Sequence, residues 1–79
     1  MSPALRPLRP REPMPDFVST ALEESGMVSA YEARPPYQRN DYLLWINTAK
    51  RADTKQKRLA QMLDELKRGD AYMRMPWSG

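Results

Sequence analysis

The chain of 79 residues contains no cysteine and no histidine. The lack of cysteine excludes disulfides, thiolate metal sites and a cysteine nucleophile. The lack of histidine removes the commonest general base and the commonest metal ligand. Small secreted domains usually depend on disulfides, so their absence favours a cytoplasmic location. We therefore expect a protein that is not an enzyme and that uses no catalytic residue, metal or cofactor.

Long apolar runs and glycine-rich stretches are also missing. No run approaches the roughly 20 apolar residues that a membrane-spanning helix needs, and the three glycines form no phosphate-binding loop. The adjacent acids Glu23–Glu24 and Asp64–Glu65 would point about 100° apart on a helix, so neither pair converges on a substrate. A chain of this length makes one domain at most.

Positive charge is concentrated near the N-terminus. The net charge is +3, and residues 1–14 supply most of it through three arginines against one glutamate. Because this stretch is rich in proline, we expect a disordered leader over 1–14. Pro7 and Pro10 have the spacing of a PxxP ligand, but a solvated leader is the favoured interpretation. The remaining chain is nearly neutral, which argues little for nucleic acid.

Apolar residues recur at helical spacing over residues 15–69, which predicts an all-α bundle of three to four helices. The first helix should begin near Pro15 and end at Gly26, and a short helical turn should follow over 27–33. Two longer helices, Pro36–Lys50 and Asp53–Arg68, should form a C-terminal antiparallel hairpin, with Gly69 ending the second. The expected core is Leu22, Tyr42, Trp45, Ile46, Leu59, Leu63 and Leu66.

Two details of this bundle can be predicted more closely. Asp53 followed by Gln56 fits a capping box at the start of the last helix. Trp45 is expected at the centre of the bundle, with the 36–50 helix as the central element. The tail over 70–79 carries Tyr72 and Trp77 and is too apolar to be only a solvated extension. It should either fold back on the bundle or form an exposed contact patch.

One motif spans the 36–50 helix and the basic residues after it. The pattern Tyr42-x-x-Trp45-Ile46-x-x-Ala49-Lys50, followed by a basic cluster, resembles the C-terminal helical domain of the YdeI/OmpD-associated, or bacteriocin-protection, family of bacterial proteins. The likeness covers about residues 15–69. It implies a helical domain linked to bacteriocin tolerance and an outer-membrane porin, with no agreed mechanism. Many relatives carry a β-rich domain before this one.

The chain departs from the family pattern at four positions. The family usually has Ser and His where this chain has Tyr37 and Gln38, Leu in place of Arg34, and Pro in place of Ala52. Chemistry that depended on that Ser and His could not take place here.

The candidate binding site is the basic corner, residues 50–58, between the two longer helices. It carries five cations and one acid. Together with the first turn of a helix it would suit a phosphate or a partner's carboxylates. The alternative is a solvated face whose cations pair locally with Asp41, Asp53 or Asp64. The candidate residues are Lys50, Arg51, Thr54, Lys55 and Arg58.

The sequence thus favours a non-enzymatic cytoplasmic interaction module that binds another protein or a small anion. Binding would use the basic corner or the Tyr72–Trp77 tail. The alternative is nucleic-acid or other polyanion binding through residues 50–58, and such binding would weaken steeply with salt. A third possibility is a subunit of an enzyme that is active only beside a missing domain. Tyr42 and Trp45 could also stack on bases, but core packing is the favoured role for both.

Overall fold

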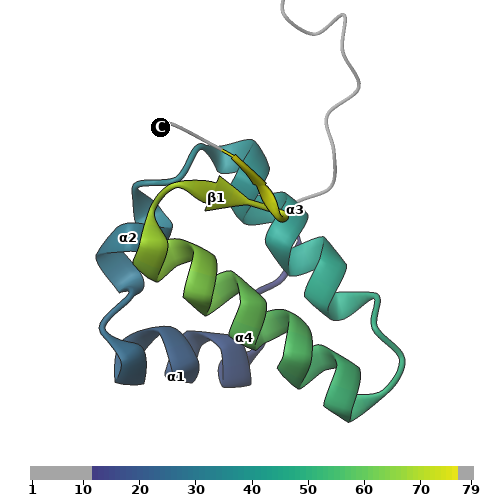
Figure 1. Cartoon of the computed structure of the whole chain (residues 1–79). Coiled ribbons are helices and arrows are strands. Elements are labelled where there is room, and N and C mark those ends of the chain that lie inside the picture. Colours follow the sequence, from purple (N-terminus) through teal and green to yellow (C-terminus); the bar gives the residue numbers. More distant parts are fainter. Residues whose placement is uncertain (1–11, 77–79) are drawn as a thin grey trace, which may run out of the picture.

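The computed structural model describes residues 12–76, and helices make up most of this part of the chain (Figure 1). The predicted helical class is confirmed, but the structure adds a small antiparallel hairpin after the last helix, which the sequence analysis missed. Residues 1–11 of the expected leader, and Trp77 in the tail, lie outside the described residues. The elements are α1 (Asp16–Ser25), α2 (Val28–Glu32), α3 (Pro36–Asn47), α4 (Ala52–Arg68), β1 (Ala71–Tyr72) and β2 (Met75–Pro76).

The helix ends follow from glycine and proline. Gly26 and Gly69 close α1 and α4 with φ of 71° and 77°, the left-handed region that glycine adopts without a Cβ penalty. Pro36 occupies the first turn of α3, where its missing N–H costs nothing. These three predicted positions are confirmed.

The predicted capping box at the start of α4 is wrong. The helix begins at Ala52 rather than Asp53, and its N-cap residue, Arg51, makes no capping hydrogen bond through its side chain. Asp53 therefore lies inside the first turn, where its carboxylate accepts a hydrogen bond of 2.9 Å from the amide of Thr54. Its negative charge still complements the positive end of the helix dipole.

The core lies between α4 and the elements around it. The longest helix, α4, contacts α1, α2, α3 and β1, so α4 rather than α3 is the central helix (Figure 1). Trp45 and Leu63 are only partly buried and pack against the rim of the core, so the indole does not occupy the expected central position. The buried cluster consists of Val18, Leu22, Tyr31, Tyr42, Leu43, Ile46, Leu59, Met62 and Leu66.

The chain leading into α1 lies against α3. The amide of Glu12 donates a hydrogen bond of 2.8 Å to the Asn40 side chain. The Asn47 side chain donates to the Glu12 carboxylate at 3.3 Å and to the Pro13 carbonyl at 3.0 Å. Residues 12 and 13, expected within the leader, are therefore attached to the bundle. Within residues 12–76, no helix combines the length and apolar character needed to cross a bilayer.

Candidate functional site

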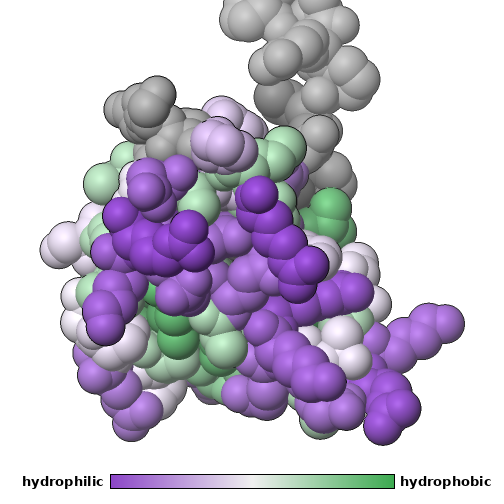
Figure 2. All heavy atoms as spheres, viewed as in Figure 1, coloured by the Kyte–Doolittle hydropathy of each residue, from purple (hydrophilic) through white to green (hydrophobic). Residues whose placement is uncertain are grey.

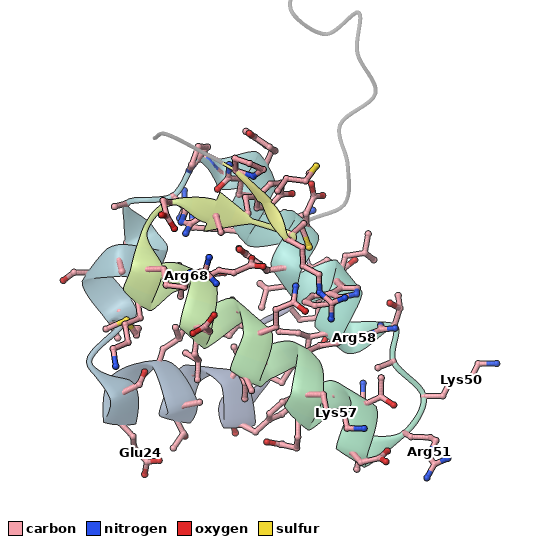
Figure 3. All side chains as sticks on the ribbon, in the orientation of Figure 1. Glu24, Lys50, Arg51, Lys57, Arg58 and Arg68 are labelled. Carbon is pink, nitrogen blue, oxygen red and sulfur yellow. The ribbon has the colours of Figure 1, made fainter. Side chains whose placement is uncertain are left out.

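The basic corner joins the end of α3 to the start of α4. Lys50 and Arg51 lie in the connection and are exposed, and Figure 3 shows both pointing away from the bundle. Thr54, Lys55 and Arg58 follow on the first two turns of α4 and are partly buried. The structure thus places all five predicted residues at one corner of the molecule, but it gives them different surroundings.

Two of the corner cations bind the end of α3. Lys55 Nζ donates to the carbonyls of Asn47 at 3.0 Å and Ile46 at 3.4 Å. Arg58 Nη1 donates to the carbonyl of Trp45 at 2.6 Å, and its guanidinium lies 5.3 Å from the centre of the indole ring. Cations at this position offset the negative end of the α3 dipole and bind carbonyls of its last turn. Lys55 and Arg58 therefore fix the bend between the two helices.

The other cations face solvent. Arg51 forms an ion pair of 3.3 Å with Asp53, in which both side chains are more than half exposed, so the pair contributes little to stability. Lys50 and Lys57 are exposed as well. Hydrophilic side chains project from this end of the molecule in the space-filling view (Figure 2). Lys50, Arg51 and Lys57 are thus the cations that a partner could contact directly.

Charge is segregated along the fold. Residues 50–58 contain five cations and one acid, whereas residues 16–32, which form α1 and α2, contain four acids and no cation. Figure 3 shows Glu24 on α1 at the opposite side of the molecule from Lys50 and Arg51. The corner therefore has a net charge of +4, whereas residues 12–76 as a whole carry ten basic and ten acidic residues.

A second polar site lies under the C-terminal hairpin, and the sequence analysis did not predict it. Arg34, Gln38 and Glu65 are almost fully buried. Arg34 Nη1 donates to the Gln38 side chain at 3.2 Å and to the Ala71 carbonyl at 2.8 Å, while Nη2 donates to the Glu65 carbonyl at 2.9 Å. One guanidinium thus joins the start of α3, the end of α4 and β1.

The Glu65 carboxylate is the centre of this site. It accepts hydrogen bonds from the Tyr42 hydroxyl, from the amides of Met73 at 2.8 Å and Arg74 at 2.9 Å, and from the Gln61 side chain at 3.1 Å. Burial alone would raise the pKa of Glu65, but these hydrogen bonds outweigh it and lower the pKa below the ordinary 4.5. Burial and the nearby Glu65 carboxylate together raise the pKa of Tyr42.

An aromatic cluster seats the hairpin on α3. The Tyr72 ring meets the rings of Tyr37 and Tyr42 edge-on, with centroids 6.0 and 5.4 Å apart. Its hydroxyl donates to the Asp41 carboxylate at 2.7 Å. Edge-to-face contacts of this kind are favourable because the ring edge is positive and the face negative. Residues 70–76 of the tail therefore lie against the bundle.

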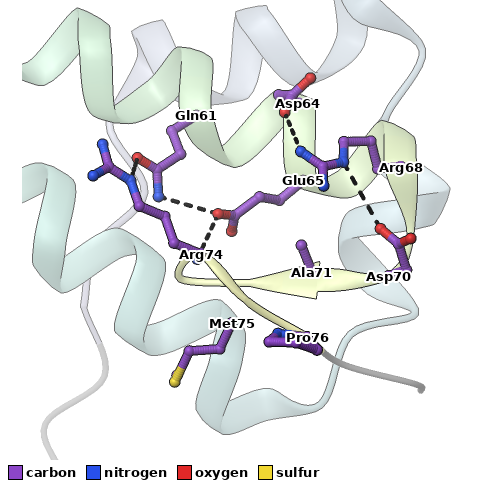
Figure 4. A pocket seen from close by; sticks show the side chains of 9 residues that line it. All are labelled: Gln61, Asp64, Glu65, Arg68, Asp70, Ala71, Arg74, Met75 and Pro76. Carbon is purple, nitrogen blue, oxygen red and sulfur yellow. Dashed lines mark hydrogen bonds and ion pairs between the residues drawn. The ribbon is translucent and has the colours of Figure 1, made fainter.

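An open pocket of about 470 Å³ lies between α4 and the hairpin (Figure 4). Arg68 at its edge is already paired with Asp64 at 3.4 Å and with Asp70 at 3.8 Å, so charges of both signs offset one another there. Within residues 12–76, no group of three potential metal-ligating side chains was found. The lining residues are Gln61, Asp64, Glu65, Arg68, Asp70, Ala71, Arg74, Met75 and Pro76.

A signal for the buried polar site was present in the sequence. Glu65 interrupts the apolar stripe between Met62 and Leu66. Arg34 and Gln38 occupy positions at which the chain departs from the family pattern, and the structure shows them hydrogen-bonded to each other. The third departure, Tyr37, accepts a hydrogen bond of 3.1 Å from Gln38. Three departures from the pattern thus form one connected network.

Fold and site define a small helical domain with a basic corner and a buried polar network. The sequence matches the family described as "Bacteriocin-protection, YdeI or OmpD-Associated" over residues 13–69, and the chain belongs to this family. The matched range includes all four helices and ends at Gly69, before the hairpin. No curated protein and no solved structure gives a significant match to the chain.

Proposed function

We propose that this domain is a non-catalytic interaction module whose basic corner binds an acidic surface of a partner protein. The observation that supports it is the concentration of positive charge at one corner, where Lys50, Arg51 and Lys57 are exposed, whereas the rest of residues 12–76 carries five cations and nine acids. Electrostatic complementarity of this kind orients partners and speeds their encounter. Because Lys55 and Arg58 fix the bend, the exposed cations are presented from a rigid support.

The buried polar groups support a structural role better than a catalytic one. Within residues 12–76, every buried side-chain nitrogen and oxygen has a hydrogen-bond partner. The carboxylate of Glu65, the most promising acid, is occupied by its four donors and has a lowered pKa, which suits an anchor rather than a general acid. The family description mentions bacteriocin protection, and in keeping with it we propose a cytoplasmic role in tolerance of bacteriocins or envelope stress.

Polyanion binding is the second candidate. The exposed corner cations and the arginines of residues 1–11 could together contact phosphates. Ten basic and ten acidic residues offset one another between positions 12 and 76, which gives nucleic acid no broad basic surface. A protein partner with a small acidic patch fits this distribution better than a duplex does.

A titration with two model ligands tests the proposal. ¹⁵N-labelled protein is titrated with poly-glutamate and, separately, with a short DNA duplex. We expect poly-glutamate to shift the amides of residues 50–58 and the DNA to bind more weakly. Stronger binding of DNA, with a steep loss between low and physiological salt, would replace the protein-partner proposal with the polyanion alternative.

Two substitutions that change charge equally provide the control. Lys50→Glu lies at the corner, and Lys67→Glu lies near the other end of α4; both residues are exposed. Lys50→Glu should weaken poly-glutamate binding about threefold or more, while Lys67→Glu should leave it nearly unchanged. Equal losses in the two variants would show a general charge effect and would remove the basic corner as the binding site.

A further inference from the structure

The C-terminal hairpin, residues 70–76, is attached to the bundle through both its backbone and its side chains. Arg34 binds the carbonyl of Ala71, and Glu65 binds the amides of Met73 and Arg74. Side chains attach it as well: Tyr72 lies against the rings of Tyr37 and Tyr42, and Arg74 Nε donates to the Gln61 side chain at 3.0 Å. The receiving groups come from the connection before α3, from α3 itself and from the last turns of α4, and we call them the hairpin groove.

The hairpin turn depends on the groove for its shape. Met73 and Arg74 have φ of 51° and 66°, the left-handed values of a tight two-residue turn that usually contains glycine or asparagine. Glu65 accepts hydrogen bonds from the amides of both residues and so holds the turn in this conformation. A hairpin of two-residue strands is not stable alone. The hairpin therefore keeps its conformation only when it is seated in the groove.

The groove is equally incomplete without a hairpin. If the hairpin left, Arg34 would lose its bond to Ala71, and Glu65 would lose two of its four donors. Water would then replace these partners, and seating a hairpin again would restore hydrogen bonds to charged groups, which are stronger than neutral ones. The segment whose groups match the groove in full is the same hairpin on another copy of the chain.

We propose that the hairpin groove is a self-recognition site that accepts the hairpin of a second copy, so that two chains exchange residues 70–76. The hinge is Gly69, which has a left-handed φ and no Cβ and follows the last residue of α4, Arg68; only Asp70 lies between Gly69 and β1. Exchange of an identical element keeps every native contact, so it needs no new complementary surface. This site is independent of the proposed function of the basic corner.

The short connection between α4 and the hairpin determines the protein concentration at which exchange between chains occurs. A short linker holds a chain's own hairpin near its groove at an effective concentration on the order of millimolar. Exchange between chains should therefore compete at protein concentrations of about 1 mM, and less so in dilute solution. Unfolding and refolding a concentrated mixture supplies the opening step.

Cross-linking of two single-cysteine variants tests the exchange, because the chain has no cysteine of its own. Arg74 Nε lies 3.0 Å from Gln61 Oε1, so Arg74→Cys and Gln61→Cys mark the hairpin and the groove. The two variants are refolded together and treated with a short bis-maleimide. A covalent heterodimer of the two chains reports a hairpin seated in the groove of the other copy.

The matched control pairs Arg74→Cys with Glu24→Cys, which lies on α1 and is exposed. We expect the Arg74/Gln61 heterodimer at about 1 mM to exceed this collision background about tenfold and to fall on dilution. Adding Tyr72→Ala to the Arg74→Cys chain should return the yield to background. Circular dichroism verifies that each variant folds.

The double variant Gln61→Cys/Arg74→Cys shows that the cross-linker reaches across a seated hairpin, since it should give a linked monomer in dilute solution. With that link established, a heterodimer yield equal to the control pair would overturn the proposal. Unlabelled chain refolded at the same concentration should also show a dimer by size-exclusion chromatography, and its complete absence would overturn the proposal independently.

Discussion

Tyr42 on α3 donates a hydrogen bond from its hydroxyl to the carboxylate of Glu65 on α4, and both residues are buried. The same carboxylate holds the turn of the C-terminal hairpin through the amides of Met73 and Arg74. One acid of α4 therefore connects this helix to both α3 and the hairpin. Hydrogen bonds to a charged acceptor in a buried site are stronger than neutral ones, so we expect stability to depend on this residue.

Replacement of Glu65 by glutamine should destabilise the fold. Glutamine has nearly the same shape, but it loses the negative charge and turns one acceptor into a donor that faces the hairpin amides. We expect a loss of about 2–3 kcal/mol in the free energy of unfolding, measured by urea denaturation with circular dichroism. Glu24→Gln on the exposed face of α1 makes the same chemical change and should cost less than about 0.5 kcal/mol. Equal effects would contradict the anchoring role.

The contribution of Glu65 should disappear in acid. Its pKa is lowered in the folded protein from the ordinary 4.5, so the unfolded chain takes up a proton first as pH falls. The stabilising effect is complete above pH 4.5 and is lost as pH falls through the folded pKa. The difference in unfolding free energy between the wild type and Glu65→Gln should therefore be constant near neutrality and shrink below that pH. A difference that did not change with pH would show that the charge of Glu65 is unimportant.

The contribution of Tyr42 to stability should depend on pH in the opposite direction. Burial and then Glu65 raise its pKa above the ordinary 10.0, so its stabilising effect is complete below pH 10.0 and is lost as pH rises beyond it. Wild-type stability should therefore fall in alkali, and Tyr42→Phe should fall less steeply. The decline will not vanish, because burial also raises the pKa of Tyr31. Parallel curves for the two proteins would contradict this assignment.

The helices could be predicted because their signals are local. Gly26 and Gly69 end helices through backbone freedom that other residues lack, and the apolar stripes identify the faces that pack. The central role of α4 could not be predicted in the same way. The order of packing depends on how α1 and α2 fold back over it, and spacing within each helix does not determine that arrangement.

The basic corner was predicted as a cluster, but the sequence did not show which of its cations bind α3 and which face solvent. Sequence spacing brings Lys50 to Arg58 together because the connection between α3 and α4 is short. It does not show that Lys55 and Arg58 reach back to carbonyls of α3, since this depends on the direction in which α3 ends.

The Glu65 site was missed in the sequence for a related reason. Its partners on α3 and the hairpin lie 23 and 8 residues away, and the hairpin has no strong sequence signal.

The contact between Arg58 and Trp45 predicts a difference between two neighbouring cations. Arg58 donates to the Trp45 carbonyl and lies over its ring, whereas Lys57 is exposed. Arg58→Ala should cost about 1–2 kcal/mol of unfolding free energy, because it removes both a hydrogen bond and a cation–π contact. Lys57→Ala should cost less than about 0.5 kcal/mol.

In a Trp77→Phe background, Arg58→Ala should also shift the Trp45 emission to longer wavelength and increase its quenching by acrylamide, because the guanidinium covers the indole. Unchanged emission together with equal stability of the two variants would show that Arg58, like Lys57, is only a surface charge, and the bend between α3 and α4 would then depend on Lys55 alone among the corner cations of the described chain.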